Sequence, residues 1–290
     1  MLILPPLAAE PIIHIGSFAI TNSMLNAFLA TLLLSIFAFF LNLGIRKHYP
    51  KNIAPKGLLN FFEAILEFLL GYLDGVTRDR KKSLMFLPIV GGLFLFILIS
   101  NWMGLLPGTG SFGYGHVVDG HFAVIEPILR PANTDLNMTL AMAVFAVILS
   151  HFFGIFTIGF FKYANKFIKF GDLYQAAKSL SPMKMMVAFI EFFVGLIEVF
   201  SELAKMVSLS LRLFGNIFAG EVLLTVIGSL IAGYGAFFIP LPFMALEILV
   251  GIVQATVFAM LTLVYLTIAT TPVPEHGREE HKAAEHSQAG

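Results

Sequence analysis

The sequence predicts an all-α polytopic membrane protein with about five transmembrane helices and one interfacial amphipathic helix. Hydrophobic residues make up 58% of the 290-residue chain and charged residues only 12%, which is too apolar for a single water-soluble core. Long stretches contain no charged side chain at all. The apolar sequence near the C-terminus far exceeds one bilayer thickness, so the last two helices are expected to be long and strongly tilted.

A helix that spans the bilayer needs about 20 mostly apolar residues. Three stretches of this kind, Met24 to Ile45, Leu84 to Leu106 and Leu136 to Phe161, contain no Asp, Glu, Lys or Arg. These stretches are the first three expected spans.

The apolar sequence from Met183 to Ala269 is long enough for two helices. Gly and Pro residues between Gly233 and Pro242 predict the break that separates them. A helix from Met183 to about Leu230 would measure on the order of 70 Å against a hydrocarbon core of roughly 30 Å, so it must tilt or bend.

Between the first two spans, the stretch from Gly57 to Val76 has apolar residues at helical spacing, interrupted by Glu63, Glu67 and Asp74. This pattern predicts an amphipathic helix that lies along the membrane surface. A buried helix packed on its neighbours explains the pattern equally well, so both interpretations stay open.

The basic residues set the orientation, because cytoplasmic loops carry an excess of Lys and Arg. With five spans, the basic side chains around the amphipathic helix, after the third span and in the C-terminal tail all fall on one side. The opposite side receives only Arg130. The N-terminus is therefore expected outside and the C-terminus in the cytoplasm.

Charge and cysteine content exclude several classes of function. The 18 basic and 18 acidic residues balance, so the chain lacks the basic field that attracts nucleic acid. It contains no cysteine, which excludes disulfides, thiolate metal sites and thiol nucleophiles. We expect no cofactor and no metal ion.

Ionisable side chains inside a membrane helix cost about 2.5 to 3.5 kcal/mol at its centre and usually mark an ion or substrate path. In the fourth predicted helix, such side chains recur at helical spacing and share one face. They are Glu191, Glu198, Glu202, Lys205, Arg212 and Asn216, while Glu221 lies on a different face. In the fifth helix, Glu247, Gln254 and Tyr265 share one face. We expect the two faces to line a shared aqueous or partner-lined space.

Not every ionisable residue on this face of the fourth helix, which we call the charged row, needs a function. Glu202 and Lys205 could equally form a local ion pair at a cytoplasmic helix end, and for Glu191 an ordinary surface role is favoured. Arg212 is different, because an arginine cannot lose its proton and no acidic residue lies three or four positions away. It requires an anion from elsewhere.

The chain is expected to form one membrane domain over residues 1–290. Its segments are an outer N-terminal segment (1–23), the first span with a cytoplasmic loop (24–56), the interfacial helix with a basic loop (57–82), the second and third spans with an outer loop (83–182), two long tilted ion-path helices (183–270) and a mobile cytoplasmic tail (271–290).

The stretch Ser208-Leu-Ser-Leu-Arg212-Leu-Phe-Gly-Asn216-Ile-Phe-Ala-Gly-Glu221 resembles the signature of the bacterial-type subunit a family of the F-type ATP synthase. Further stretches resemble the same family in the same order and extend the likeness over nearly the whole chain. They are His14-Ile-Gly-Ser-Phe-Ala-Ile-Thr-Asn-Ser, Ser100-Asn-Trp-Met-Gly-Leu-Leu-Pro-Gly, Thr134-Asp-Leu-Asn-Met-Thr-Leu-Ala, Gln254-Ala-Thr-Val-Phe and Val264-Tyr-Leu-Thr-Ile-Ala.

The resemblance implies a stator subunit, not catalytic alone, in the plasma (inner) membrane of a bacterial cell. Such a subunit forms two offset proton half-channels against a rotating ring of c subunits and couples proton flow to ATP synthesis. Its implied partners are the c-ring, the peripheral-stalk b subunits, other ATP synthase subunits, membrane lipid and the translocated H⁺, with Na⁺ not excluded.

The resemblance also implies roles for single residues. Arg212 resembles the essential arginine that faces the carboxylate of the c-ring, and Glu198 resembles a residue on the path to the cytoplasm. The other implied members of the ion path are Ser208, Asn216, Glu221, Glu247, Gln254 and Tyr265. The sequence departs from the family at Glu247, where many bacterial members have a histidine beside the glutamate at position 221.

A secondary ion-coupled transporter is the alternative, because buried charges and broken helices also build substrate sites. Inverted repeats should make the two halves of such a transporter similar, yet the charged row occurs only in the C-terminal third. An intramembrane enzyme is a weaker alternative, since the sequence has no paired metal-ligand motif and no Gly-x-Ser-x-Gly.

Overall fold

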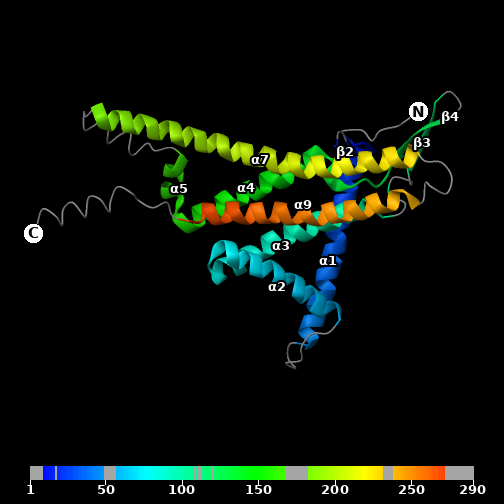
Figure 1. The fold of residues 1–290 in the computed structure, drawn as a ribbon, viewed down its shortest axis with the longest axis horizontal. Helices are drawn as coiled ribbons and strands as arrows, with labels where there is room; N and C mark the ends of the chain where they lie inside the picture. The colour runs from blue at the N-terminus through cyan, green and yellow to red at the C-terminus, as the bar shows by residue number, and fades with distance from the viewer. Residues whose placement is uncertain are drawn as a thin grey trace, which may run out of the picture. The chain divides into compact units, whose positions relative to one another are not determined.

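The computed structural model describes residues 9–16, 18–48, 57–106, 109, 113–118, 121–167, 182–230 and 238–271. Helices make up most of this part (Figure 1), which confirms the predicted all-α fold class. They are α1 (Asn22–His48), α2 (Leu58–Thr77), α3 (Arg80–Met103), α4 (Leu136–Ile158), α5 (Phe160–Phe167), α7 (Pro182–Leu230) and α9 (Pro240–Ala269), with a short 3-10 helix, η2 (Ala132–Thr134).

Four helices in the described part, α1, α3, α4 and α9, are long and apolar enough to cross a membrane. They correspond to the first three predicted spans and to the last one. Large apolar side chains on them point outward, and Phe156 on α4 is 73% exposed. In a chain that spans the bilayer, such side chains contact lipid or a partner subunit.

Helix α7 corresponds to the predicted fourth helix and begins and ends almost where the sequence predicts. Its 49 residues, at 1.5 Å per residue, give a length on the order of 70 Å. The first half of the predicted break between Gly233 and Pro242 lies outside the described residues, and α9 begins within its second half, at Pro240.

Helix α4 ends at Ile158, before the predicted Phe161. The cause is Gly159, whose φ of 94° lies in the left-handed region and stops the helix. The short helix α5 follows, and the Tyr163 hydroxyl on α5 lies 2.7 Å from Nδ1 of His151 on α4.

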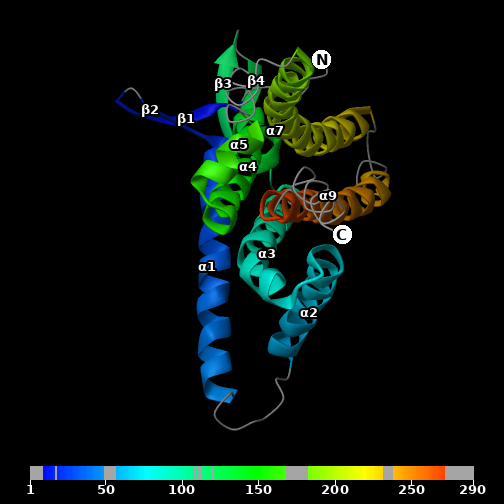
Figure 2. The same ribbon diagram turned by 90° about the vertical axis from the view of Figure 1, so that its left-hand side faces the viewer.

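Helix α2 packs on α3 (Figure 2), and the side chains that it buries are Leu69, Leu70 and Leu73. This confirms that part of the amphipathic helix packs on its neighbour; a position along the membrane surface stays a prediction. Asp79 caps α3 by accepting a hydrogen bond from the backbone N–H of Lys81 at 2.9 Å. A hydrogen bond with Ser83 lowers the pKa of Asp74 near the end of α2, and the paired Arg80 guanidinium lowers it further.

Two antiparallel hairpins were not predicted. Strands β1 (Pro11–Ile15) and β2 (Phe18–Thr21) pair before α1, and β3 (Gly113–Val118) pairs with β4 (His121–Pro127) between α3 and α4. Strand β4 leads into η2, which contacts both α1 and α3.

The chain divides into two compact units, residues 1–148 with 200–264 and residues 149–199 with 265–290. The core of the first unit contains fully buried side chains from α1, α2, α3, α4, α7 and α9, among them Val90 of α3, Leu213 of α7 and Phe258 of α9. In the second unit Gly154 permits close contact, because a Cβ atom there would lie 2.4 Å from the Tyr163 ring. The predicted segment boundaries stay predictions.

Candidate ion path

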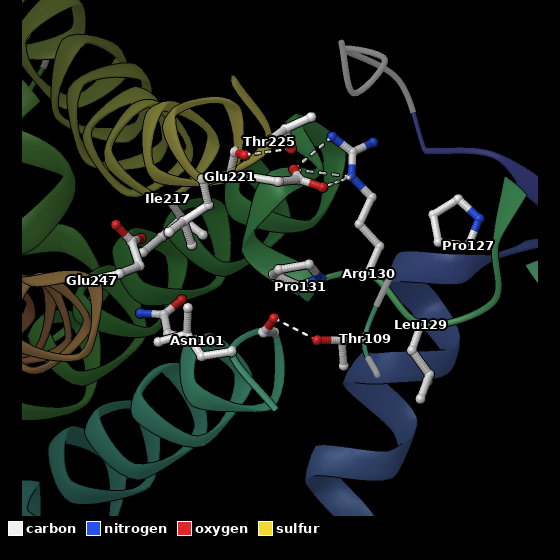
Figure 3. Close-up of a pocket in the computed structure, with 13 residues that line it drawn as sticks. Asn101, Thr109, Pro127, Leu129, Arg130, Pro131, Ile217, Glu221, Thr225 and Glu247 are labelled. Atoms are coloured by element: carbon white, nitrogen blue, oxygen red, sulfur yellow. Dashed lines mark hydrogen bonds and ion pairs between the residues drawn. The ribbon is translucent and has the colours of Figure 1, made fainter. Parts of the chain in front are cut away.

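The first unit contains a cavity of about 190 Å³, which we call the outer cavity. It is lined by residues of α3, of the segment between β4 and η2, of α7 and of α9 (Figure 3). The polar side chains in its lining are Asn101, Thr109, Arg130, Glu221, Thr225 and Glu247. The structure therefore brings both predicted outer carboxyl groups to one cavity, together with an arginine.

Arg130 and Glu221 form a two-pronged ion pair in the lining of the outer cavity. Arg130 Nε donates to Glu221 Oε1 at 3.0 Å and to Oε2 at 3.2 Å, and Nη2 donates to Oε2 at 2.9 Å. Arg130 is only 2% exposed. Such charge-assisted, paired contacts are among the strongest hydrogen bonds in proteins and fix both side chains in direction.

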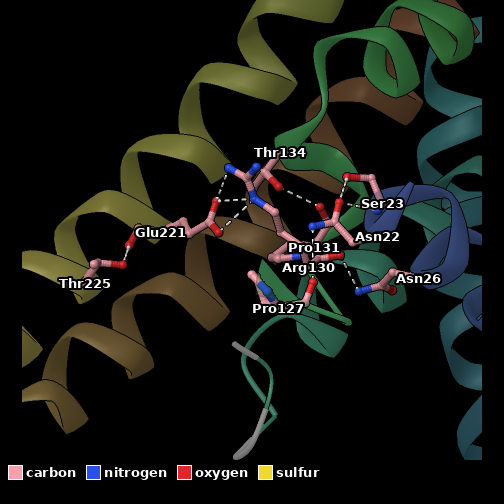
Figure 4. Close-up of polar contacts among 9 residues, drawn as sticks. All are labelled: Asn22, Ser23, Asn26, Pro127, Arg130, Pro131, Thr134, Glu221 and Thr225. Carbon is pink, nitrogen blue, oxygen red and sulfur yellow. Dashed lines mark hydrogen bonds and ion pairs between the residues drawn. The ribbon is translucent and has the colours of Figure 1, made fainter. Parts of the chain in front are cut away.

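The backbone around Arg130 is held by α1 (Figure 4). Asn26 Nδ2 donates to the carbonyl oxygen of Arg130 at 2.8 Å, and Asn22 Nδ2 donates to that of Pro127 at 3.3 Å. Both asparagines are fully buried. These two bonds tie the backbone at Pro127 and at Arg130 to α1, so they fix the position from which the Arg130 side chain extends.

The C-terminal end of α3 packs closely against the segment between β4 and η2. A Cβ atom at Gly104 would lie 2.2 Å from Cγ of Pro131, so the helix end admits only a glycine here without displacing Pro131. Asn133 Nδ2 of η2 donates to Oδ1 of Asn101 on α3. The Nδ2 atom of Asn101 is buried and has no hydrogen-bond partner among the described residues.

Glu247 of α9 lies in the same lining but is not paired. It is 7% exposed and makes no hydrogen bond or ion pair with any residue that the structure describes. A Cβ atom at Gly220 of α7 would lie 2.0 Å from its Oε2, so Gly220 makes room for this carboxyl group.

The polar faces of α7 and α9 meet at Asn216 and Gln254. Asn216 Nδ2 donates to Gln254 Oε1 at 2.8 Å. Gln254 is 2% exposed, whereas Asn216 is exposed. The faces expected to line one shared space are thus in contact at this pair.

Arg212 and Ser208 lie on the exposed side of α7. Within the described part of the chain, Arg212 forms neither a hydrogen bond nor an ion pair. Its side chain is exposed, and its partner, if it has one, is not among the described residues.

The remaining members of the charged row behave differently. Lys205 Nζ lies 2.6 Å from Glu202 Oε1, which confirms the local ion pair that the sequence left open. Glu198 and Tyr265 are half-buried, and each interacts with other residues of the chain. The side chain of Glu191 lies outside the described residues.

The family model of the ATP synthase A chain matches residues 24–267. The chain belongs to this family. The resemblance found at the Arg212 signature is thereby confirmed, and the protein is a membrane-sector subunit of an F-type ATP synthase.

Curated relatives in this family cover nearly the same length. The chain is 31% identical over 259 residues to "ATP synthase subunit a" of Mycobacterium ulcerans, a match that covers 88% of this chain and 89% of the relative. It is 32% identical over 255 residues to "ATP synthase subunit a" of Moorella thermoacetica, covering 88% and 93%. It is 30% identical over 268 residues to "ATP synthase subunit a 2" of a Bradyrhizobium species, covering 92% and 97%.

For this member of the ATP synthase A chain family, sequence reasoning missed Arg130 and the asparagines around it. Arg130 was noted only as the single basic residue on the predicted outer side. The available signal was that Arg130 stands alone: it is the single basic residue on the predicted outer side, and it lies beside Pro131 just before a predicted span. An arginine in that position is a candidate for a specific partner. Its partner Glu221 lies 91 positions away, so no local spacing could reveal the pair.

Proposed function

We propose that this chain is the stator subunit that forms two proton half-channels against a rotating c-ring. In this account it couples transmembrane proton flow to ring rotation and ATP synthesis, and it is not catalytic alone. Family membership supports the assignment. The observation that carries it is Arg212, a cation on the exposed side of a long membrane helix, without a partner in the part of the chain that the structure describes.

Arg212 can act as the switch for a carboxyl group on the ring. A ring carboxyl group must be neutral while it faces lipid, because an ion in hydrocarbon is costly. Beside Arg212 the carboxylate is stabilised: at about 4 Å and an effective dielectric constant of about 20, two unit charges attract by about 4 kcal/mol. That is enough to drive off a proton that the lipid-facing carboxyl group had retained.

The same fixed charge keeps the two half-channels apart. It repels a proton or hydronium ion that would otherwise cross directly from one half-channel to the other. Asn216 lies one helical turn from Arg212, and its bond to Gln254 joins α7 to α9 there. Protons can then cross only while bound to the carboxyl groups of the rotating ring.

The outer half-channel is proposed to pass through the outer cavity, with Glu221 and Glu247 in its lining. The inner half-channel is proposed to involve Glu198 and Tyr265, with Ser208 beside Arg212 on α7. Glu202 and Lys205 neutralise each other locally and are not needed as carriers.

The proposed setting is the inner membrane of a bacterial cell, with the N-terminus outside and the C-terminus in the cytoplasm. The proposed partners are the c-ring, the peripheral-stalk b subunits, the other ATP synthase subunits and lipid. The proposed ion is H⁺, with Na⁺ as the variant that the ring carboxyl group and its ligands would decide.

The direct test of the assembly is to purify the chain from its own membranes in mild detergent and identify its partners by mass. A ring of small hairpin subunits and a soluble ATP-hydrolysing head should copurify in fixed ratio. Recovery of the intact chain without either of them would contradict the proposal.

A further inference from the structure

We propose that Arg130 is a positioning residue of the outer half-channel, which holds Glu221 in place and balances its charge so that Glu247 is the carboxyl group that exchanges protons there. This inference rests on the proposed function. It divides the two carboxyl groups of the outer cavity, which the family resemblance treats as a pair, into a fixed one and a free one.

The geometry of the Arg130–Glu221 pair supports the first part of the proposal, that Arg130 holds Glu221 in place. Both carboxylate oxygens of Glu221 accept N–H donors from the guanidinium, at 2.9 to 3.2 Å. An arginine in a protein keeps its proton, so it can offer only donors. A carboxylate whose two oxygens both accept hydrogen bonds from a guanidinium is poorly placed to bind and release a proton in each cycle.

The burial of Arg130 shows that the fold itself holds this side chain in position for its ion pair with Glu221. The side chain is 2% exposed, and its backbone carbonyl is held by Asn26 of α1. Gly104 lets α3 approach Pro131, the next residue. A buried arginine held in this way would be strongly destabilising without its anion, so Arg130 and Glu221 act as one neutral unit.

The surroundings of Glu247 support the second part of the proposal, that Glu247 exchanges protons. It faces the same cavity, and the charged groups that line this cavity with it are Glu221 of α7 and Arg130 of the segment after β4. Helix α3 contributes the uncharged Asn101, whose buried Nδ2 has no partner among the described residues. Such a cavity has room and polar partners for water. Of its two carboxyl groups, Glu247 is the one that no basic side chain of the described residues binds.

The test is a charge-removal cycle in the complete ATP synthase, reconstituted in lipid vesicles and driven by ATP, with proton uptake followed by a pH-sensitive dye. The variants are Arg130→Gln, Glu221→Gln and the double variant, compared at equal amounts of assembled complex. Each single change leaves one charge of the pair without its partner, so each should lower proton flux about tenfold. The double variant removes both charges of the pair together, and its flux should exceed that of either single variant by at least about threefold.

The pH profile separates positioning from bulk structure. The double variant keeps Glu247, so the pH midpoint of its flux should match that of the unaltered complex, whereas Glu247→Gln should change the profile. Arg130→Lys keeps the charge but lacks the planar fork, so its flux should lie between those of Arg130→Gln and the unaltered complex. The matched control is Arg80→Gln, which also breaks an arginine–carboxylate pair but at an exposed site, and it should change flux less than about twofold.

The inference is overturned if the double variant is no better than the worse single variant, or if Glu221→Gln alone conducts normally with an unchanged pH profile. The second outcome can be read even if Arg130→Gln fails to assemble. Failure of the proposed function itself would look different, because Arg212→Ala would then pump normally whatever the Arg130 variants do.

Discussion

The carboxyl group of Glu247 on α9 lies directly against the Cα atom of Gly220 on α7. A Cβ atom at position 220 would lie 2.0 Å from Oε2 and 2.2 Å from Cδ of Glu247. Such distances are far inside van der Waals contact, so any other residue at 220 must displace this carboxyl group. Gly220 thus sets where Glu247 sits in the outer cavity.

Gly220→Ala should therefore disturb proton flux without preventing assembly. The added methyl group meets the end of a flexible side chain, so Glu247 moves while the helix backbone stays. We expect flux to fall about tenfold, as for a misplaced catalytic group, measured as ATP-driven acidification of vesicles. The matched control is Gly228→Ala on the same helix, where the methyl group meets nothing within 4 Å. Equal flux in the two variants would show that the position of Glu247 does not matter.

Replacing both Glu221 and Glu247 with Gln should slow proton flux and change its pH dependence. The reason is that the outer cavity then loses both carboxyl groups and keeps the lone charge of Arg130. Flux is measured across a series of external pH values, with complex content checked on gels. An unaltered rate together with an unaltered pH profile would mean that the outer half-channel runs elsewhere.

The N-terminus should lie outside and the C-terminus in the cytoplasm. The chain contains no cysteine, so single cysteines at Ser17 and Ser287 can be labelled without background. Both positions lie outside the described residues. An impermeant thiol reagent should reach the first from outside intact cells and the second only in inverted vesicles. Labelling of both from one side would rule out an odd number of spans.

The sequence predicted the long helices well because their signal is local. Leu136 begins α4 as expected, and α7 runs from Pro182 to Leu230 because its apolar residues recur at helical spacing with no proline after the first residue. The pair of Glu202 and Lys205 was also foreseen as an option, since three positions bring side chains together on a helix.

The hairpins and the contacts around Arg130 were harder to predict. The hairpin of β3 and β4 is a short local pairing between spans, and apolar periodicity over a window of bilayer length does not detect it. The bond between Arg130 and Glu221 joins positions 91 apart, and the hydrogen bond from Asn26 to Arg130 joins positions 104 apart. Contacts of this kind depend on how the helices pack, which spacing along one helix does not encode.

Arg212→Lys tests which property of Arg212 matters. Lysine keeps a positive charge, but in a site of low dielectric it can lose its proton, and it lacks the planar fork that engages a carboxylate through two bonds. We expect this variant to suppress the passive proton leak at least in part while failing to support ATP synthesis. A Lys variant that leaks as freely as an Ala variant would mean that charge alone does not form the barrier.

The most direct test of the central claim is proton movement in membrane vesicles that carry Arg212→Ala. The change removes both proposed effects of the guanidinium, the discharge of the arriving ring carboxyl group and the barrier between half-channels. ATP-driven pumping and ATP synthesis should be lost, yet the vesicles should conduct protons passively once the soluble head is stripped away. Normal coupled pumping by Arg212→Ala would contradict the account.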